Sequence, residues 1–329
     1  MKFSLVGSFD LADGYLGAAK ALEKAGIEVC FIPAQKYLCE NGHSIHIKMI
    51  KEDLIRDNPD YVLWWRGETL GDIDLKNIKK TINKPFILYS WDDPFQWEVH
   101  RELPAKCRFL DYAFTCCRSS VEFYKKFGCF NSFYCPPGFD PEIHYPEEDE
   151  NYKCDISFVC TNLYHGNSLT KMPHVSRKNL LDIITKEFNG LDIRLYGFEN
   201  FKEIYPEIYK GWIPFNESRK VFYNSKINLN SHIRPDGHMY INERVSQILG
   251  SGGLLLVDNV EGIENVLDIN SECFVYDKKD VKTVIDKIKE ILLNEERAKE
   301  VSNNGYKKAI CNFTWDNWAR NVMKGIKLL

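Results

Sequence analysis

A polar loop that leads into a helix contains most of the side chains that could hold an anion. The positions concerned are Arg234, Asp236, Gly237, His238, Asn242 and Arg244. The first N–H groups of a helix have no partner inside the helix, and the helix dipole favours negative charge there. Arginine adds charge-assisted hydrogen bonds to phosphate oxygens. We therefore expect this loop to bind a phosphate; the alternative is a solvated surface loop with a turn at Pro235.

Two of these residues have a second interpretation within the helix itself. Asn242 could serve only as the residue that caps the helix N-terminus. Arg244 in the first turn opposes the helix dipole, and an anion bound at the same place would reverse that penalty. Arg244 therefore indicates an anion, while Asn242 fits both interpretations.

The residues that follow predict a helix and then a buried strand. One apolar face at helical spacing is formed by Ile241, Val245, Ile248 and Leu249. Gly252 and Gly253 end this helix, and residues 254–257 form an all-apolar run that ends at Asp258. Loop, helix and buried parallel strand are the unit from which ligand sites are built at the open end of an α/β sheet.

A pair of carboxylates follows a predicted strand in the first half of the chain. Trp91, Asp92 and Asp93 precede Pro94 directly after the strand at residues 85–89. The carboxyl ends of parallel strands border ligand sites, and a carboxylate there could bind a sugar hydroxyl or remove its proton. The alternative is a turn in which one aspartate caps the next helix.

Two other patterns are typical of metal sites but lack the rest of a ligand set. Asp72-x-Asp74 lies before a short predicted helix, where capping is the better interpretation. His43-x-x-His46 has no nearby third and fourth ligand, so we expect no structural metal.

Four basic residues cluster before the first predicted helix of the second half, which begins at Arg177. They are His165, Lys171, His174 and Arg177 itself. They fit a basic phosphate-binding loop and a polar surface equally well.

Composition narrows the class of protein. The net charge of −4 over 329 residues gives no electrostatic reason to expect a nucleic-acid partner. The eleven cysteines form no C-x-x-C pair, which favours reduced, buried thiols in a cytoplasmic protein. The N-terminus resembles a strand rather than a signal peptide, and no apolar run approaches the roughly 18 residues of a membrane span.

Strands and helical stretches alternate along both halves of the chain, which predicts parallel, doubly wound sheets. The predicted strands are 3–6, 27–32, 61–65, 85–89, 112–116 and 132–135, then 155–159, 193–196, 227–230, 254–257 and 273–276. Residues 141–151, rich in Pro, Glu and Asp, are expected to link the halves. Two Rossmann-like domains would place a ligand in the cleft between them.

These motifs together resemble a known family. The run Asn242-x-Arg244-Val-Ser-Gln247, followed by Gly252-Gly-Leu-Leu-Leu, resembles the N-x-R-x-F-E signature of group-1 glycosyltransferases. Trp91-Asp92-Asp93-Pro94 is similar to a motif of that family's spore-maturation-like branch. Further matching pieces are residues 134–140, 155–159 and 313–315. The resemblance covers nearly the whole chain, and the order and spacing of the motifs are more specific than any one of them.

The resemblance implies an α/β chain with the GT-B fold and an interdomain cleft. Residues 1–140 would form an acceptor domain and residues 152–313 a nucleotide-sugar-binding domain, with the C-terminal helix at about 314–329 packing back on the first. It also implies transfer of a sugar from a nucleoside diphosphate, UDP by default, to an acceptor hydroxyl. The transfer would be retaining and would require no metal or other cofactor. The nucleotide sugar is then a co-substrate, and the acceptor is a glycan, a lipid, a protein or a modified nucleobase.

The resemblance also assigns roles to residues. Donor-binding residues would be Arg177, Gly197, Trp212, Arg234, Gly237, His238, Asn242, Arg244 and Gln247. Candidate catalytic residues are Asp92, Asp93 and Asp236. The acceptor side would include Gly7, Ser8 and Trp91.

Two positions depart from the family pattern. Gln247 stands where the family has the glutamate that holds the donor ribose, and Met239 stands where larger relatives carry a second glutamate. These replacements leave two rivals open: a nucleotide-sugar-binding protein without turnover, and a GT-B-like sugar-nucleotide epimerase.

Overall fold

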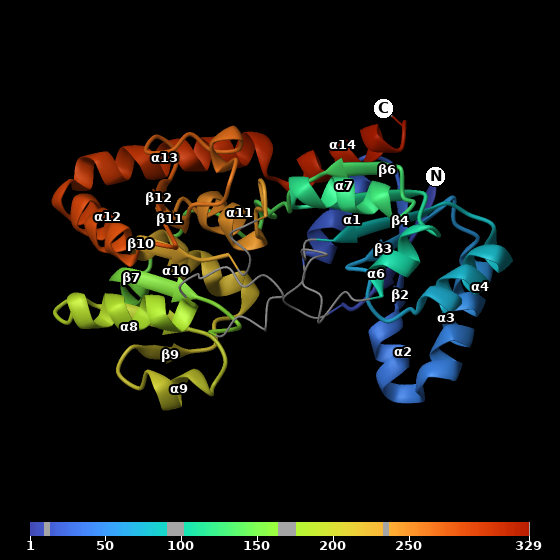
Figure 1. Cartoon of the computed structure of the whole chain (residues 1–329), viewed down its shortest axis with the longest axis horizontal. Helices are drawn as coiled ribbons and strands as arrows, with labels where there is room; N and C mark the ends of the chain where they lie inside the picture. The colour runs from blue at the N-terminus through green and yellow to red at the C-terminus, as the bar shows by residue number, and fades with distance from the viewer. Residues whose placement is uncertain (10–13, 91–101, 164–175, 233–236, 329) are drawn as a thin grey trace. The chain divides into compact units, whose positions relative to one another are not determined.

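A computed structural model describes residues 1–9, 14–90, 102–163, 176–232 and 237–328. The chain divides into two compact units, of which the first combines Met1–Gly138 with Trp315–Leu329 and the second is Phe139–Thr314 (Figure 1). Within the described ranges, no helix has the length and apolar composition that crossing a membrane requires.

The first unit is built on a six-stranded parallel sheet with the order β2-β1-β3-β4-β5-β6 (Figure 1). Its strands are β1 Lys2–Gly7, β2 Glu28–Pro33, β3 Tyr61–Trp65, β4 Phe86–Ser90, β5 Tyr112–Thr115 and β6 Asn131–Tyr134. Its helices are α1 Tyr15–Lys24, α2 Ala34–Asn41, α3 His43–Asp57, α4 Asp72–Ile82, α6 Leu103–Cys107, α7 Arg118–Lys126 and α14 Trp315–Gly325. The strand order reverses direction between β1 and β3, so the crevice for a ligand is expected there.

Successive strand residues enter opposite cores of this unit. Trp65 packs with Trp315 and Trp318 on the face covered by α1 and α14, whereas Trp64 packs on the face covered by α3 and α4. Gly17 lets α1 approach α14 closely, because a Cβ atom there would lie 2.2 Å from the Trp315 ring. The C-terminal helix is therefore an integral part of the first unit's core.

The second unit repeats the plan with the strand order β12-β11-β10-β7-β8-β9. Its strands are β7 Cys154–Val159, β8 Ile193–Tyr196, β9 Tyr209–Gly211, β10 Ser225–Asn230, β11 Leu255–Asp258 and β12 Phe274–Tyr276. Its helices are α8 Arg177–Glu187, α9 Phe201–Ile204, α10 Ser218–Asn224, α11 Glu243–Gly250, α12 Val281–Leu293 and α13 Glu295–Asn312. The order reverses between β7 and β10, which makes this pair of strands the expected ligand position.

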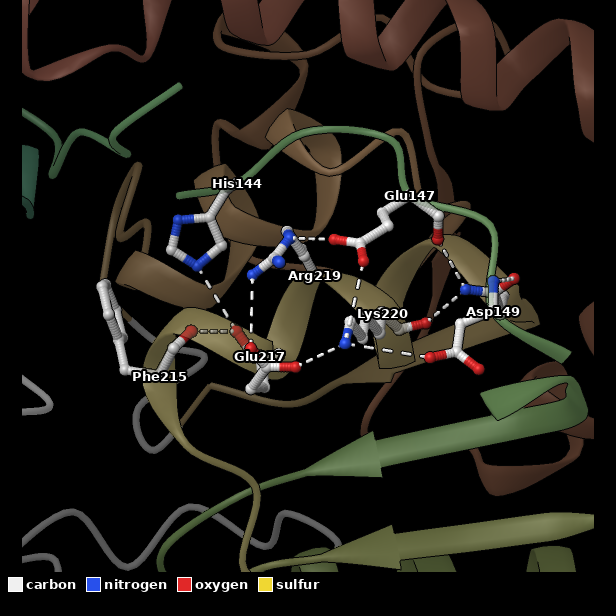
Figure 2. Close-up of polar contacts among 9 residues, drawn as sticks. His144, Glu147, Asp149, Phe215, Glu217, Arg219 and Lys220 are labelled. Carbon is white, nitrogen blue, oxygen red and sulfur yellow. Dashed lines mark hydrogen bonds and ion pairs between the residues drawn. The ribbon is translucent and has the colours of Figure 1, made fainter. Parts of the chain in front are cut away.

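The segment expected to link the two halves is packed on α10 rather than extended away from it. Arg219 donates to the Glu147 carboxylate, and Lys220 lies between Glu147, Asp149 and Glu217 (Figure 2). The segment is therefore held to the second unit by a network of charges.

His144 lies at the buried end of the same network. Its side chain is fully buried, and its ring packs edge-on against Phe215 at 4.9 Å (Figure 2). Its Nε2 lies 3.4 Å from the Ser218 hydroxyl. Burial and, after it, the charge of Arg219 lower the pKa of His144 from 6.5 to about 3. Protonation of this ring is thus unfavourable in the folded chain.

We expect this histidine to make the second unit sensitive to acid. Between pH 6.5 and 3 the unfolded chain binds the proton that the folded chain excludes, so stability falls as the pH is lowered. At pH 4.5 the loss amounts to about 3 kcal/mol, since each pKa unit corresponds to 1.36 kcal/mol. In urea unfolding at pH 7 and pH 4.5, His144→Leu should lose less stability on acidification than the wild type. Equal losses of stability in the two proteins would show that His144 is not the source of the acid sensitivity.

Candidate functional site

Polar residues from separate parts of the sequence meet at the carboxyl edge of the second sheet. Cys160 follows β7, Ser231 and His232 follow β10, Asp258 ends β11, and Lys278 follows β12. The carboxyl ends of parallel strands share one edge, so these residues line up in the order of the strands. The point of reversal, between β7 and β10, lies within this row.

Arg177 is placed at that point but has most of its donors occupied. Its side chain is buried, its Nε and one terminal nitrogen donate to the Ser231 carbonyl, and its other terminal nitrogen donates to the Asn162 carbonyl. The guanidinium thus links the segments that follow β7 and β10. It contributes positive charge to the site, and two of its five N–H groups have no acceptor in the described part of the chain.

Arg244, in the first turn of α11, is a second basic residue of this site. Its Nε is buried and has no hydrogen-bond acceptor among the residues that the structure describes. Burial and then the positive charge of Arg177 lower the pKa of Arg244 to about 10. A buried guanidinium nitrogen without an acceptor costs free energy that an anion would return. The geometry therefore agrees with an anion site at the start of α11.

Asn242 caps α11. Its Oδ1 accepts from the Val245 N–H at 3.2 Å and from the Asn230 amide at 3.3 Å, while its Nδ2 donates to Asn230 Oδ1. The capping interpretation is confirmed. The cap also ties the helix start to the end of β10.

A buried triad beside Arg177 was not identified from the sequence. His232 Nδ1 and the His232 backbone N–H both donate to Asp258 Oδ1, at 2.9 and 2.8 Å, and Lys278 donates to the His232 carbonyl. Burial alone raises the pKa of Asp258, but the charges and hydrogen bonds of its neighbours outweigh it and lower the pKa to about 2. Asp258 is therefore ionised, and the exit of β10 is rigidly held.

Gly197 and Trp212 lie farther along the same edge, after β8 and β9. A Cβ atom at Gly197 would lie 2.3 Å from the Cys160 carbonyl, so close packing requires glycine here. Trp212 is half exposed and stacks on Phe198 with ring centres 5.5 Å apart and planes 9° apart. The two rings border a hollow of about 480 Å³ that also includes Glu199 and Lys202. An exposed aromatic surface of this kind can stack with a planar base.

Gln247 lies one turn into α11 and is buried, with 6% of its surface exposed. Its side-chain amide offers both a donor and an acceptor, which suits a ligand hydroxyl.

Gly237 and His238 lie in the segment that leads to α11. Met239 follows with a φ of +52°, a left-handed conformation that is uncommon for a residue with a side chain. Its N–H donates to the Glu261 carbonyl at 2.6 Å, and a Cβ atom at Gly262 would lie 2.7 Å from His238 Nε2. The loops after β10 and β11 therefore pack tightly here.

In the first unit, Gly7 and Ser8 lie where the strand order reverses. A Cβ atom at Gly7 would lie 2.9 Å from that of Trp65, so the end of β1 tolerates no side chain. Ser8 is buried just beyond it. Several predicted site residues lie outside the described residues: Trp91, Asp92, Asp93, Arg234 and Asp236 in the candidate site, and His165, Lys171 and His174 in the basic cluster.

The aspartates and histidines of the metal-like patterns have other partners. Asp74 accepts from the Gly71 N–H at 3.1 Å at the start of α4 and lies 3.2 Å from His43, which confirms its capping role. Both ring nitrogens of His46 contact backbone carbonyls, those of His43 and Thr69. These side chains are committed to holding α3, α4 and the loop after β3 together.

Comparisons with known proteins agree with this geometry. Residues 177–324 match a family model described as glycosyl transferase-like. No curated protein matches the chain in sequence.

Solved structures match the chain over its whole length at low identity. Sucrose-phosphate synthase from Thermosynechococcus elongatus has a TM-score of 0.73 at 11% identity, covering 99% of this chain and 98% of that one. Anabaena HepE in complex with UDP-glucose has a TM-score of 0.72 at 9% identity, with both chains fully covered. A putative UDP-N-acetylglucosamine 2-epimerase from Listeria monocytogenes has 0.61 at 12%, covering 99% and 95%. These likenesses show the GT-B fold, and the predicted fold is confirmed.

Proposed function

We propose that this chain is a GT-B glycosyltransferase, as the match of residues 177–324 to the glycosyl transferase-like family model indicates, and that it moves a sugar from a UDP-sugar to an acceptor hydroxyl. The observation that carries the proposal is Arg244 at the start of α11, whose Nε has no acceptor among the described residues and which lies beside Arg177 and the point where the strand order reverses. A diphosphate is the part of the donor that this arrangement would hold. HepE, with the same fold, was crystallised with UDP-glucose, which supports UDP as the nucleotide.

The reaction breaks the bond between the sugar's anomeric carbon and the β-phosphate oxygen and forms a bond to the acceptor oxygen. Negative charge develops on the departing UDP, and Arg244, Arg177 and the N–H groups of α11 would stabilise it more in the transition state than in the bound donor. Those groups would do the work that a metal ion does elsewhere, so we propose a metal-independent transfer. The acceptor proton would pass to a carboxylate, for which Asp92 and Asp93 are the candidates.

The remaining assignments follow the family resemblance. Gly197 and Trp212 would contact the base, while Gln247 would bond a ribose hydroxyl. Arg234, Asp236, Gly237, His238 and Asn242 would complete the donor side. Gly7, Ser8 and Trp91 would lie on the acceptor side. We also propose retention of configuration, membership of the spore-maturation-like branch and a cytoplasmic location.

The test is incubation of the chain with UDP-glucose, UDP-galactose, UDP-N-acetylglucosamine and GDP-mannose, followed by chromatography of nucleotides and sugars. Release of UDP from a UDP-sugar is the expected result, by slow hydrolysis or by transfer to an added acceptor mixture. Binding without any product would contradict the proposal and favour a silent binding protein. A changed sugar that stays attached to its nucleotide would contradict it in favour of an epimerase.

A further inference from the structure

Of the two imidazole nitrogens of His232, one has a partner in the described part of the chain and the other has none there. Its side chain is fully buried, Nδ1 donates to Asp258, and Nε2 has no hydrogen-bond partner among the described residues. Leaving a buried polar atom unpaired costs free energy. The bond to Asp258 accounts for Nδ1, and the described contacts of the fold do not account for Nε2.

The bond to Asp258 fixes which nitrogen carries the proton. Since Asp258 is ionised and only accepts, a ring that carries a single proton holds it on Nδ1. The Nε2 atom of that ring presents a lone pair. Its natural partner is an O–H group, and a phosphate oxygen, which only accepts, does not match it.

The position of His232 along the sheet edge indicates which O–H group this is. The proposed base site lies after β8 and β9, and the proposed diphosphate site lies between β7 and β10. His232 and Asp258 follow β10 and β11, the next step in the same direction. A nucleotide sugar laid along this edge in the order base, diphosphate, sugar would place its sugar beside His232.

We propose that His232 Nε2 accepts a hydrogen bond from a hydroxyl group of the transferred sugar, and that Asp258 and Lys278 are positioning residues that hold the ring and backbone for it. This inference rests on the proposed function. It gives the second unit a residue that distinguishes a nucleotide sugar from the bare nucleotide.

The experiment compares His232→Asn with Tyr276→Phe and the wild type. The asparagine amide can keep the bond to Asp258 but has no atom at the Nε2 position. Tyr276→Phe removes another buried hydrogen bond of the same region, from the Tyr276 hydroxyl to the Asn230 carbonyl, and serves as the structural control. Calorimetric titration gives the Kd for UDP and for whichever of UDP-glucose, UDP-galactose and UDP-N-acetylglucosamine the wild type binds most tightly.

His232→Asn should raise the Kd for the UDP-sugar by roughly fivefold to tenfold, the effect of one neutral hydrogen bond, and leave the Kd for UDP unchanged. Tyr276→Phe should leave the ratio of the two constants as it is in the wild type. Among the monodeoxy analogues of the sugar, one should bind His232→Asn and the wild type equally well. Equal changes for UDP and UDP-sugar, or no change in either, would overturn the inference. Failure of the wild type to bind UDP at all would instead contradict the proposed function.

Discussion

Arg244→Ala is expected to lower kcat/KM for the donor by roughly 10²- to 10³-fold, the effect of removing one preorganised group that stabilises charge in a transition state. The same substitution should leave the melting temperature unchanged or raise it. Arg244 is half-buried next to Arg177, and its Nε has no acceptor in the described part of the chain, so its removal relieves repulsion and desolvation.

The matched control is Arg297→Ala on α13, which removes an exposed arginine paired with Glu300. Initial rates of UDP release and thermal unfolding curves on the same preparations give both quantities. Near-normal turnover in Arg244→Ala would remove this residue from the donor site. A large drop in melting temperature would show that Arg244 affects turnover by stabilising the fold.

Asp258→Ala is expected to reduce the free energy of unfolding by about 3–5 kcal/mol, the range measured when one member of a buried ionic network is removed. It leaves the Lys278 ammonium and the His232 Nδ1 in the interior without the carboxylate that both face. The wild-type network should also respond to acid. Because the pKa of Asp258 is lowered from 3.8 to about 2, its contribution is complete above pH 4 and is lost as the pH falls toward 2.

Urea unfolding at pH 7 and pH 3 measures both effects. Asp286→Asn, on the exposed side of α12, is the control and should change stability by less than about 0.5 kcal/mol. A loss below about 1 kcal/mol in Asp258→Ala would mean that the triad does not hold the exit of β10.

The alternation of apolar runs was sufficient to predict the sheets. Residues 61–65 and 193–196 were predicted as strands and are β3 and β8, and the other predicted strands differ from the observed ones by one or two residues at their ends. Long parallel strands are buried on both faces, so their sequences are continuously apolar and easy to identify. β9 was missed because this short edge strand contains the exposed Lys210 and lacks such a run.

The starts of α4 and α11 were also predictable, because the residues that cap a helix lie within one turn of its first residue. Asn242 caps α11, and Asp74 of the Asp72-x-Asp74 pair accepts from the backbone N–H at the start of α4. The triad of His232, Asp258 and Lys278 has no such local signature. Its members come from three strands, and only the order β12-β11-β10 brings them together. The sequence signal for this triad was Asp258 at the end of an all-apolar run, since a charge at the end of a buried strand needs a partner.

A thermal-shift titration of the purified chain with UDP, GDP and ADP tests most directly whether the edge of the second sheet is a nucleotide-sugar site. Ligand at a hundred times its Kd stabilises the folded state by about 2.7 kcal/mol, enough to raise the melting temperature by several degrees. We predict such a rise with UDP, a smaller one with GDP and ADP, and none with UDP in Arg244→Ala. No rise with any nucleotide, or the same rise in Arg244→Ala as in the wild type, would contradict the account.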